Sequence, residues 1–135
     1  MTARNLARQP LHLGLRASAV PQPEFPADNE QAMAWYADYA ARTEADGAEG
    51  RLVSSYRFTE DWQGWEMHPA GDEVVICTGG EMELVQLVDG EEKRTVLRAG
   101  EYAVNPAGCW HTADIAGEAT AIFITAGQGT QHRPR

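Results

Sequence analysis

Two short patches of the chain hold the side chains best suited to bind a metal ion or to transfer a proton. The first patch contains Glu66, His68 and Glu73, and the second contains His111. Alternate residues of a β-strand share one face, so Glu66 and His68 are expected to point the same way. The Pro-Ala-Gly-Asp turn over residues 69–72 then reverses the chain, and Glu73 begins the next strand. These three side chains can therefore converge on one face of a hairpin, which His111 must reach from a distant strand.

A change of pattern at residue 51 indicates the elements that position these side chains. From there on, apolar and polar residues alternate and turn residues recur at short intervals, which is typical of short β-strands. Asp89-Gly90 predicts a two-residue hairpin, because both central positions favour positive φ. Eight short strands at this spacing predict a β-sandwich or barrel, for which the double-sheet jelly roll is one solution. The predicted strands span residues 51–58, 63–68, 73–78, 81–88, 93–98, 101–104, 109–114 and 119–126.

One convincing helix precedes the strands, over residues 28–47. Asp28 or Asn29 can cap its N-terminus, and Gly47 ends it. Its apolar residues follow helical spacing, which predicts that this face packs on the sheet. These residues are Ala32, Met33, Tyr36, Tyr39 and Ala40.

The helix and the strands divide the chain into four segments. Residues 1–27 form an irregular N-terminal arm, in which prolines limit regular structure and residues 11–20 can form an edge strand. Residues 28–47 form the helix, and residues 48–127 form the barrel. Residues 128–135 are expected to be a flexible tail.

Length and charge limit the classes of function. A chain of 135 residues is one ordinary domain. Its net charge of −9 argues against binding to nucleic acid or to an anionic membrane surface. No apolar stretch has the length of a signal-peptide core or a membrane span. Because Cys77 and Cys109 form no Cys-x-x-Cys motif, a zinc-finger-like site is excluded. We therefore expect a cytoplasmic protein with free thiols, whose partner is a small molecule.

The spacing of the two patches resembles the two motifs of the cupin superfamily. Together the patches cover residues 66–111, about a third of the chain. The resemblance implies a double-stranded β-helix, or jelly-roll, barrel that is often dimeric, so we expect an all-β homodimer with one N-terminal helix packed outside. In this chain the motifs read His68-x4-Glu73-x6-Gly80 and Gly100-x5-Pro106-x-Gly108-x2-His111.

Cupins commonly bind one divalent metal through His, His, Glu and His, and the resemblance implies such a site here. His68, Glu73 and His111 match the last three positions, whereas Glu66 occupies the first. Two His and two Glu are a credible ligand set for Mn, Fe, Ni or Zn. Glu73 supports a cation, because a carboxylate inside a barrel is costly without a partner. Glu66 is either a ligand, a residue that hydrogen-bonds to a ligand, or a catalytic general base. Ile115 stands where the second motif often ends in Asn.

Other residues of the predicted strands are candidates for the walls of a pocket inside the barrel. Trp65 and Trp110 are interpreted as packing residues, and a nucleophilic pair of Cys109 and His111 is disfavoured because side chains two apart on a strand rarely hydrogen-bond. His12 and His132 lie in irregular segments and are given no role. The candidate pocket residues are Tyr56, Cys77, Met82, Gln86, Tyr102, Cys109 and Phe123.

Three functional hypotheses follow. The first is an enzyme that uses its metal as a Lewis acid or to bind oxygen, with dioxygenase, isomerase or lyase chemistry on a small organic molecule. The second is a non-catalytic module that binds or senses a small ligand, with or without metal. The third, a metal-free sugar-nucleotide epimerase, has the least support because the strand region has few basic residues to bind phosphate. The fold does not choose among these chemistries.

Overall fold

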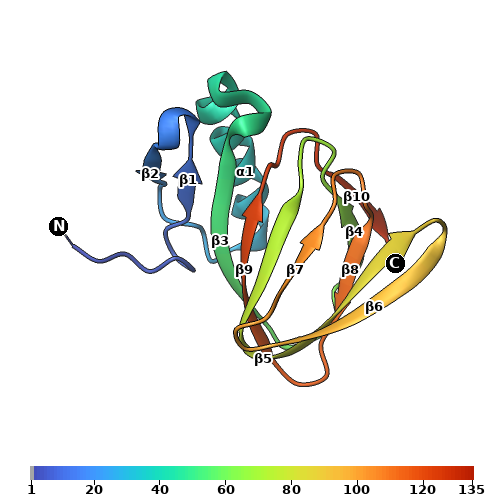
Figure 1. The fold of residues 1–135 in the computed structure, drawn as a ribbon. Coiled ribbons are helices and arrows are strands. Elements are labelled where there is room, and N and C mark those ends of the chain that lie inside the picture. The colour runs from blue at the N-terminus through green and yellow to red at the C-terminus, as the bar shows by residue number, and fades with distance from the viewer. Residues whose placement is uncertain (1) are drawn as a thin grey trace.

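Antiparallel strands are the predominant secondary structure, and one α-helix lies beside them (Figure 1). The computed structural model describes residues 2–135. In chain order the elements are β1 (Leu11–Leu13), the 3-10 turn η1 (Leu15–Ala17), β2 (Ala19–Pro21), α1 (Asn29–Thr43), the 3-10 segment η2 (Glu44–Glu49), β3 (Arg51–Phe58), β4 (Gly64–Met67), β5 (Glu73–Val88), β6 (Glu91–Arg98), β7 (Tyr102–Asn105), β8 (His111–Asp114), β9 (Ala119–Thr125) and β10 (Gln131–Pro134).

Strand β5 belongs to both sheets of the barrel. Its first half pairs with β7 and β9, and its second half pairs with β6 and β8, in every case antiparallel. Strand β3 extends the first sheet from β9, and β4 and β10 extend the second from β8. Between the sheets lies an apolar core that includes Val75, Met82, Leu97 and Phe123. The jelly-roll barrel with one N-terminal helix outside is therefore confirmed.

The two strands predicted over 73–78 and 81–88 are one bent strand. A bulge between Cys77 and Gly79 lets β5 turn from one sheet to the other. Gly80 has φ +66°, and a Cβ atom built there would lie 2.0 Å from the carbonyl oxygen of Glu118. Only glycine fits this corner. Gly79-Gly80 therefore marks a change of sheet, which local sequence cannot distinguish from an ordinary turn.

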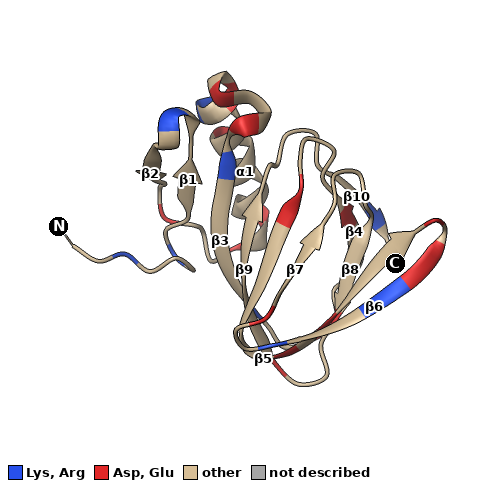
Figure 2. Ribbon diagram, viewed as in Figure 1, with Lys and Arg blue, Asp and Glu red and all other residues tan. Residues whose placement is uncertain are grey.

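The predicted hairpin at Asp89-Gly90 is present between β5 and β6. Both residues have positive φ, 53° and 81°, as a two-residue turn of this kind requires. Beyond the turn, Arg94 of β6 forms ion pairs with Glu83 and Asp114. Figure 2 shows basic and acidic residues side by side on β6. This part of the hairpin is thus a solvated, charged surface.

Helix α1 covers one side of the barrel, next to β3 (Figure 1). Its N-terminus is capped by Asp28, whose carboxylate accepts a hydrogen bond from the backbone N–H of Glu30 at 2.9 Å. The helix ends at Thr43, four residues before the predicted end, and the chain continues as the 3-10 segment η2. No helix within residues 2–135 is long and apolar enough to cross a membrane.

The predicted apolar face of the helix is only partly correct. Tyr39 is buried, but Met33 is 80% exposed and Tyr36 is 40% exposed. The buried stripe runs instead through Trp35 and Tyr39, which pack with Leu52 of β3. The helix packs on β3 along this narrow stripe, and Phe25 of the N-terminal arm packs against the same cluster. Met33 and Tyr36 are left on the side that borders a cavity.

His12 links the N-terminal arm to the helical segment. Its Nδ1 atom lies 2.6 Å from the hydroxyl of Tyr39, and its Nε2 atom lies 2.7 Å from Oδ2 of Asp46. The imidazole is 4% exposed. The irregular arm predicted over residues 1–27 is therefore anchored here, and its strands β1 and β2 pair with each other while β1 also pairs with β3. The sequence gives no indication of this contact, because its partners lie far along the chain.

Residues 128–135, which the sequence analysis expects to be a flexible tail, contain a strand. Residues Gln131–Pro134 form β10, which pairs antiparallel with β4 and sets His132 opposite Glu66. All four residues of β10 are exposed. The strand is held by backbone hydrogen bonds and lacks a buried face, so it has none of the hydrophobic alternation by which strands are predicted.

Candidate metal centre

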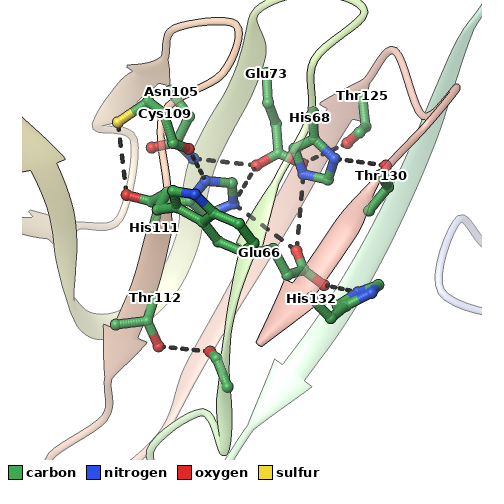
Figure 3. Close-up of polar contacts among 12 residues, drawn as sticks. Glu66, His68, Glu73, Asn105, Cys109, His111, Thr112, Thr125, Thr130 and His132 are labelled. Carbon is green, nitrogen blue, oxygen red and sulfur yellow. Dashed lines mark hydrogen bonds and ion pairs between the residues drawn. The ribbon is translucent and has the colours of Figure 1, made fainter. Parts of the chain in front are cut away.

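The four predicted ligand residues come from three strands and meet at one end of the barrel (Figure 3). Glu66 lies on β4 and His68 follows that strand directly, while Glu73 is the first residue of β5 and His111 the first of β8. Glu66 pairs with His111 across β4 and β8. The convergence predicted for the first three residues is therefore present, but the predicted hairpin is not: in the described chain β4 pairs with β8 and β10, whereas Glu73 of β5 pairs with Asn105 of β7. The return of β8 beside β4 adds the fourth residue.

The donor atoms of these residues lie close together. The Nε2 atoms of His68 and His111 lie 3.1 and 3.2 Å from different oxygens of Glu73. They lie 3.7 and 3.8 Å from Oε2 of Glu66. Donor atoms of Glu66, His68 and His111 all lie within 4.8 Å of one another. This spacing suits a single ion held between the imidazoles and carboxylates.

Hydrogen bonds on the far side of each imidazole determine which nitrogen faces the two carboxylates as an acceptor. Nδ1 of His68 lies 2.8 Å from the hydroxyl of Thr130, which itself donates to the carbonyl oxygen of Gly127. That hydroxyl must accept from His68. Nδ1 of His111 lies 3.1 Å from the carbonyl oxygen of Cys109, which can only accept. In its neutral form each ring therefore carries its proton on Nδ1, and Nε2 keeps a lone pair.

These lone pairs are the feature that fits a metal ion. Both Nε2 atoms are buried, and neither makes a hydrogen bond of acceptable geometry within the described part of the chain. Buried polar atoms of this kind are normally satisfied. Two imidazole nitrogens and carboxylate oxygens form a donor set suited to Mn, Fe, Ni or Zn. His68 and His111, with Glu66 and Glu73, therefore fit the divalent ion that the sequence predicts.

Glu73 is the buried acid of the site, at 2% exposure. One of its oxygens accepts from the side-chain amide of Asn105 at 3.1 Å, and the other accepts from the hydroxyl of Thr125 at 2.6 Å. Burial raises the pKa of Glu73, but its contacts with His111 and His68 outweigh that effect and hold the pKa below its usual range. Glu73 is thus a carboxylate, oriented by two donors.

Glu66 and His111 respond to the same electrostatics. Burial and the negative charge of Glu73 raise the pKa of Glu66, but its contacts with His111 and His68 outweigh both effects and leave that pKa lowered. The pKa of His111 is lowered by burial and raised more strongly by Glu66 and Glu73, to about 9. Oε1 of Glu66 also lies 3.2 Å from Nε2 of His132 on β10. In the apoprotein, His111 therefore forms ion pairs with Glu66 and Glu73 at the position where a metal ion fits.

A cavity of about 840 Å³ opens in front of these ligands. Glu66, His68 and Glu73 form part of its wall, and so do the predicted pocket residues Tyr56 and Phe123. Its volume lies in the range of roughly 300–1,000 Å³ typical of small-molecule sites. The structure thus places a ligand-sized space directly beside the candidate metal centre.

The other five predicted pocket residues lie outside this cavity. Cys77 and Met82 are buried in the apolar core, on the two sides of the bulge in β5. Gln86 donates to Asn105 instead of facing the cavity, and the thiol of Cys109 faces the carbonyl of Leu87. Tyr102 is 68% exposed. On β7 the inward positions are the odd-numbered ones, so the predicted orientation of Tyr102 was displaced by one residue.

Four polar residues around the ligands escaped the sequence analysis. Thr125 lies two positions beyond Phe123 on β9, and this spacing could have placed it on the same inner face. Asn105 pairs with Glu73 across β7 and β5, which becomes visible only once the strands are in register. The remaining two lie in the C-terminal segment, where no pattern points to them. The four residues are Asn105, Thr125, Thr130 and His132.

Comparison with known proteins agrees with this architecture. A solved oxalate oxidase in complex with glycolate is 22% identical with a TM-score of 0.54, over 60% of this chain and 45% of that one. A hydroquinone 1,2-dioxygenase in complex with Cd²⁺ and 4-hydroxybenzonitrile is 17% identical with a TM-score of 0.51, over 56% of each chain. These likenesses show the fold alone, and this chain spans less than half the length of the oxalate oxidase.

A search of curated protein sequences found no match. The family model for the cupin domain, in contrast, matches residues 59–127, which is half of the chain. That range contains all four candidate ligands and both motifs. With the jelly-roll topology, the match leads to one conclusion: the chain belongs to the cupin family.

Proposed function

We propose that the protein binds one divalent metal ion through Glu66, His68, Glu73 and His111 and acts on a small organic molecule in the adjoining cavity. The observation that carries the proposal is the pair of buried Nε2 atoms, which lack a hydrogen-bond partner in the described chain and lie close to two carboxylates. A buried carboxylate such as Glu73 is costly without a partner, and a divalent ion balances its charge. When bound, such an ion polarises a coordinated oxygen or activates a water molecule.

The ligands differ in their access to the cavity, which suggests different roles. The side chains of His68, Glu73 and His111 are at most 7% exposed, whereas that of Glu66 is 34% exposed. Glu66 is thus the group best placed to exchange a proton with a bound molecule, as a general base requires. His132 at its second oxygen keeps this carboxylate turned toward the centre. Proton abstraction by Glu66 suits isomerase, lyase or dioxygenase chemistry.

Metal analysis of the purified protein tests the proposal. We expect close to one ion per chain after reconstitution with Mn(II), Fe(II), Ni(II) or Zn(II), measured by elemental analysis. His68→Ala and His111→Ala should lose that ion. His12→Gln is the matched control, because it removes a buried histidine outside the site.

Two outcomes would contradict the proposal. Metal content that stays far below one ion per chain after reconstitution is the first, and a His68→Ala variant that retains its ion is the second. Gel filtration with light scattering on the same samples tests the predicted homodimer, which should elute at twice the mass of the 14.8 kDa chain.

A further inference from the structure

The cavity beside the metal centre has a wall that the cupin domain does not supply. Phe25 and the α1 residues Met33 and Tyr36 line it from one side. They precede residues 59–127, the range that matches the family model. Tyr56 and Phe123 line it from the barrel. The side chains that select a ligand in this protein therefore include a set specific to its N-terminal segment.

The two walls are joined by aromatic rings. The ring of Phe25 lies 5.5 Å from that of Tyr36 and 6.0 Å from that of Tyr56, both edge-to-face. Tyr56 in turn lies 5.9 Å from Phe123, again edge-to-face. These are the distances at which aromatic rings attract one another. An aromatic ring of a ligand could pack against the rings of both walls, Phe25 and Tyr36 on one side and Tyr56 and Phe123 on the other.

This aromatic lining continues to the metal ligands. The ring of Trp62 lies 6.0 Å from that of Phe123 and 6.3 Å from that of His111. All three side chains thus form one contact path between the hydrophobic part of the cavity and the candidate ion. A ligand that coordinates the ion would have its remaining atoms against these rings.

Two tyrosines provide a polar group in this otherwise aromatic surface. The hydroxyls of Tyr36 and Tyr56 are hydrogen-bonded to each other. Burial and their mutual contact raise the pKa of Tyr36, and burial also raises that of Tyr56, so both keep their protons at neutral pH. Two hydroxyls have two protons, and their shared bond uses one. The second remains available to an acceptor on a ligand.

The charge of the cavity argues against phosphorylated ligands. Within the described chain, Arg57 is the one Lys or Arg among the lining residues, and its guanidinium is paired with Glu118. Glu60 and Asp61 add negative charge to the wall formed by the metal-binding carboxylates. Phosphate groups are normally recognised by unpaired Arg or Lys side chains, which this cavity lacks.

We propose that the cavity binds an aromatic molecule with a metal-coordinating oxygen at one end and a hydrogen-bond acceptor at the other, directed at the Tyr36–Tyr56 pair. The ligand has no phosphate group. This inference rests on the proposed metal site and extends it to a class of ligand. Met33 and Tyr36 act as specificity-determining residues, which contact the ligand but not the ion.

Binding of small probes to the Mn(II)-loaded full chain tests this inference by equilibrium dialysis. Benzoate should bind more tightly than cyclohexanecarboxylate, and phenyl phosphate should bind more weakly than benzoate. A carbonyl acceptor on the ring, in 3- or 4-acetylbenzoate, should improve affinity over benzoate. The double variant Tyr36→Phe/Tyr56→Phe, which lacks both hydroxyls, should remove that improvement, a loss of about 3- to 10-fold for one hydrogen bond.

Tyr102→Phe is the matched control, because it removes the hydroxyl of an exposed tyrosine outside the cavity. Metal content is measured in the same samples, which separates the two proposals. A fully loaded protein that binds no aromatic carboxylate, that prefers phenyl phosphate, or that loses no acetylbenzoate affinity in the double variant overturns the ligand class and leaves the metal site standing. A protein that takes up no metal overturns both.

Discussion

The hydroxyl of Thr130 lies 2.8 Å from Nδ1 of His68, although 62 positions separate the two residues in the chain. Because this hydroxyl donates to the carbonyl oxygen of Gly127, it accepts a proton from the imidazole and leaves Nε2 free to bind metal. The C-terminal segment thus orients a ligand of the candidate centre. This segment contributes Thr130 to the site, although its strand β10 has only exposed side chains.

Thr130→Val should weaken metal binding without unfolding the protein. Loss of such an outer hydrogen bond typically reduces metal affinity by about 10- to 100-fold. Competition titration with a chelator measures the change. Thr78→Val serves as the control, because the hydroxyl of Thr78 also donates to a backbone carbonyl but lies away from the ligands. Equal affinities of the two variants would show that Thr130 does not position His68.

Metal affinity should rise with pH across the neutral range. The pKa of His111 in the apoprotein is raised to about 9, so near pH 7 a metal ion must displace a proton from this residue. One displaced proton changes affinity by about tenfold per pH unit. We expect this slope between pH 6.5 and 8.5, measured by calorimetry in buffers of different ionisation enthalpy. An affinity that is flat above pH 6.5 would mean that the pKa of His111 is not raised.

Stability of the apoprotein should change in the opposite direction. His111 has a folded pKa of about 9, above its ordinary value of 6.5, so its ion pair stabilises the fold fully below pH 6.5 and is lost as the pH rises through 9. The lowered pKa of Glu73 adds a stabilisation that is constant over this window. We expect a loss on the order of 3 kcal/mol in the free energy of unfolding.

Urea unfolding in the presence of a chelator, at pH 6 and pH 9, measures that loss. His111→Asn should abolish most of the difference between the two pH values. A wild-type apoprotein that is equally stable at both, or that gains stability at pH 9, would be inconsistent with the ion pair.

Gly80→Ala should destabilise the barrel far more than Gly90→Ala. Both glycines have positive φ, which costs an alanine about 1–2 kcal/mol. A Cβ atom at Gly90 meets open space, whereas one at Gly80 would lie 2.0 Å from the carbonyl oxygen of Glu118. The excess loss in unfolding free energy, by thermal or urea denaturation, should therefore exceed about 2 kcal/mol. Similar losses would show that the corner of β5 relaxes around a side chain.

Strand periodicity indicated the strands of the barrel, and the motif spacing indicated the four candidate ligand residues that the fold brings together (Figure 3). Alternate residues face the same way on any strand, so Glu66 and His68 share a face whatever the surrounding fold. The Asp89-Gly90 turn was equally local, because its positive φ values are a property of those two residues. For Glu73 and His111, the prediction that they bind the same metal ion depended on the cupin resemblance.

Contacts between segments that are distant in the chain could not be predicted from these local patterns. The jelly roll brings Thr130 to His68 and His132 to Glu66 through β10, a strand held by backbone bonds that carry no side-chain signal. It also places Tyr36 against Tyr56, where helical periodicity alone predicted simple packing. The residue types and their order indicate a candidate metal centre. The choice of imidazole nitrogen and the shape of the cavity arose from pairing and packing across the chain, which depend on three-dimensional register.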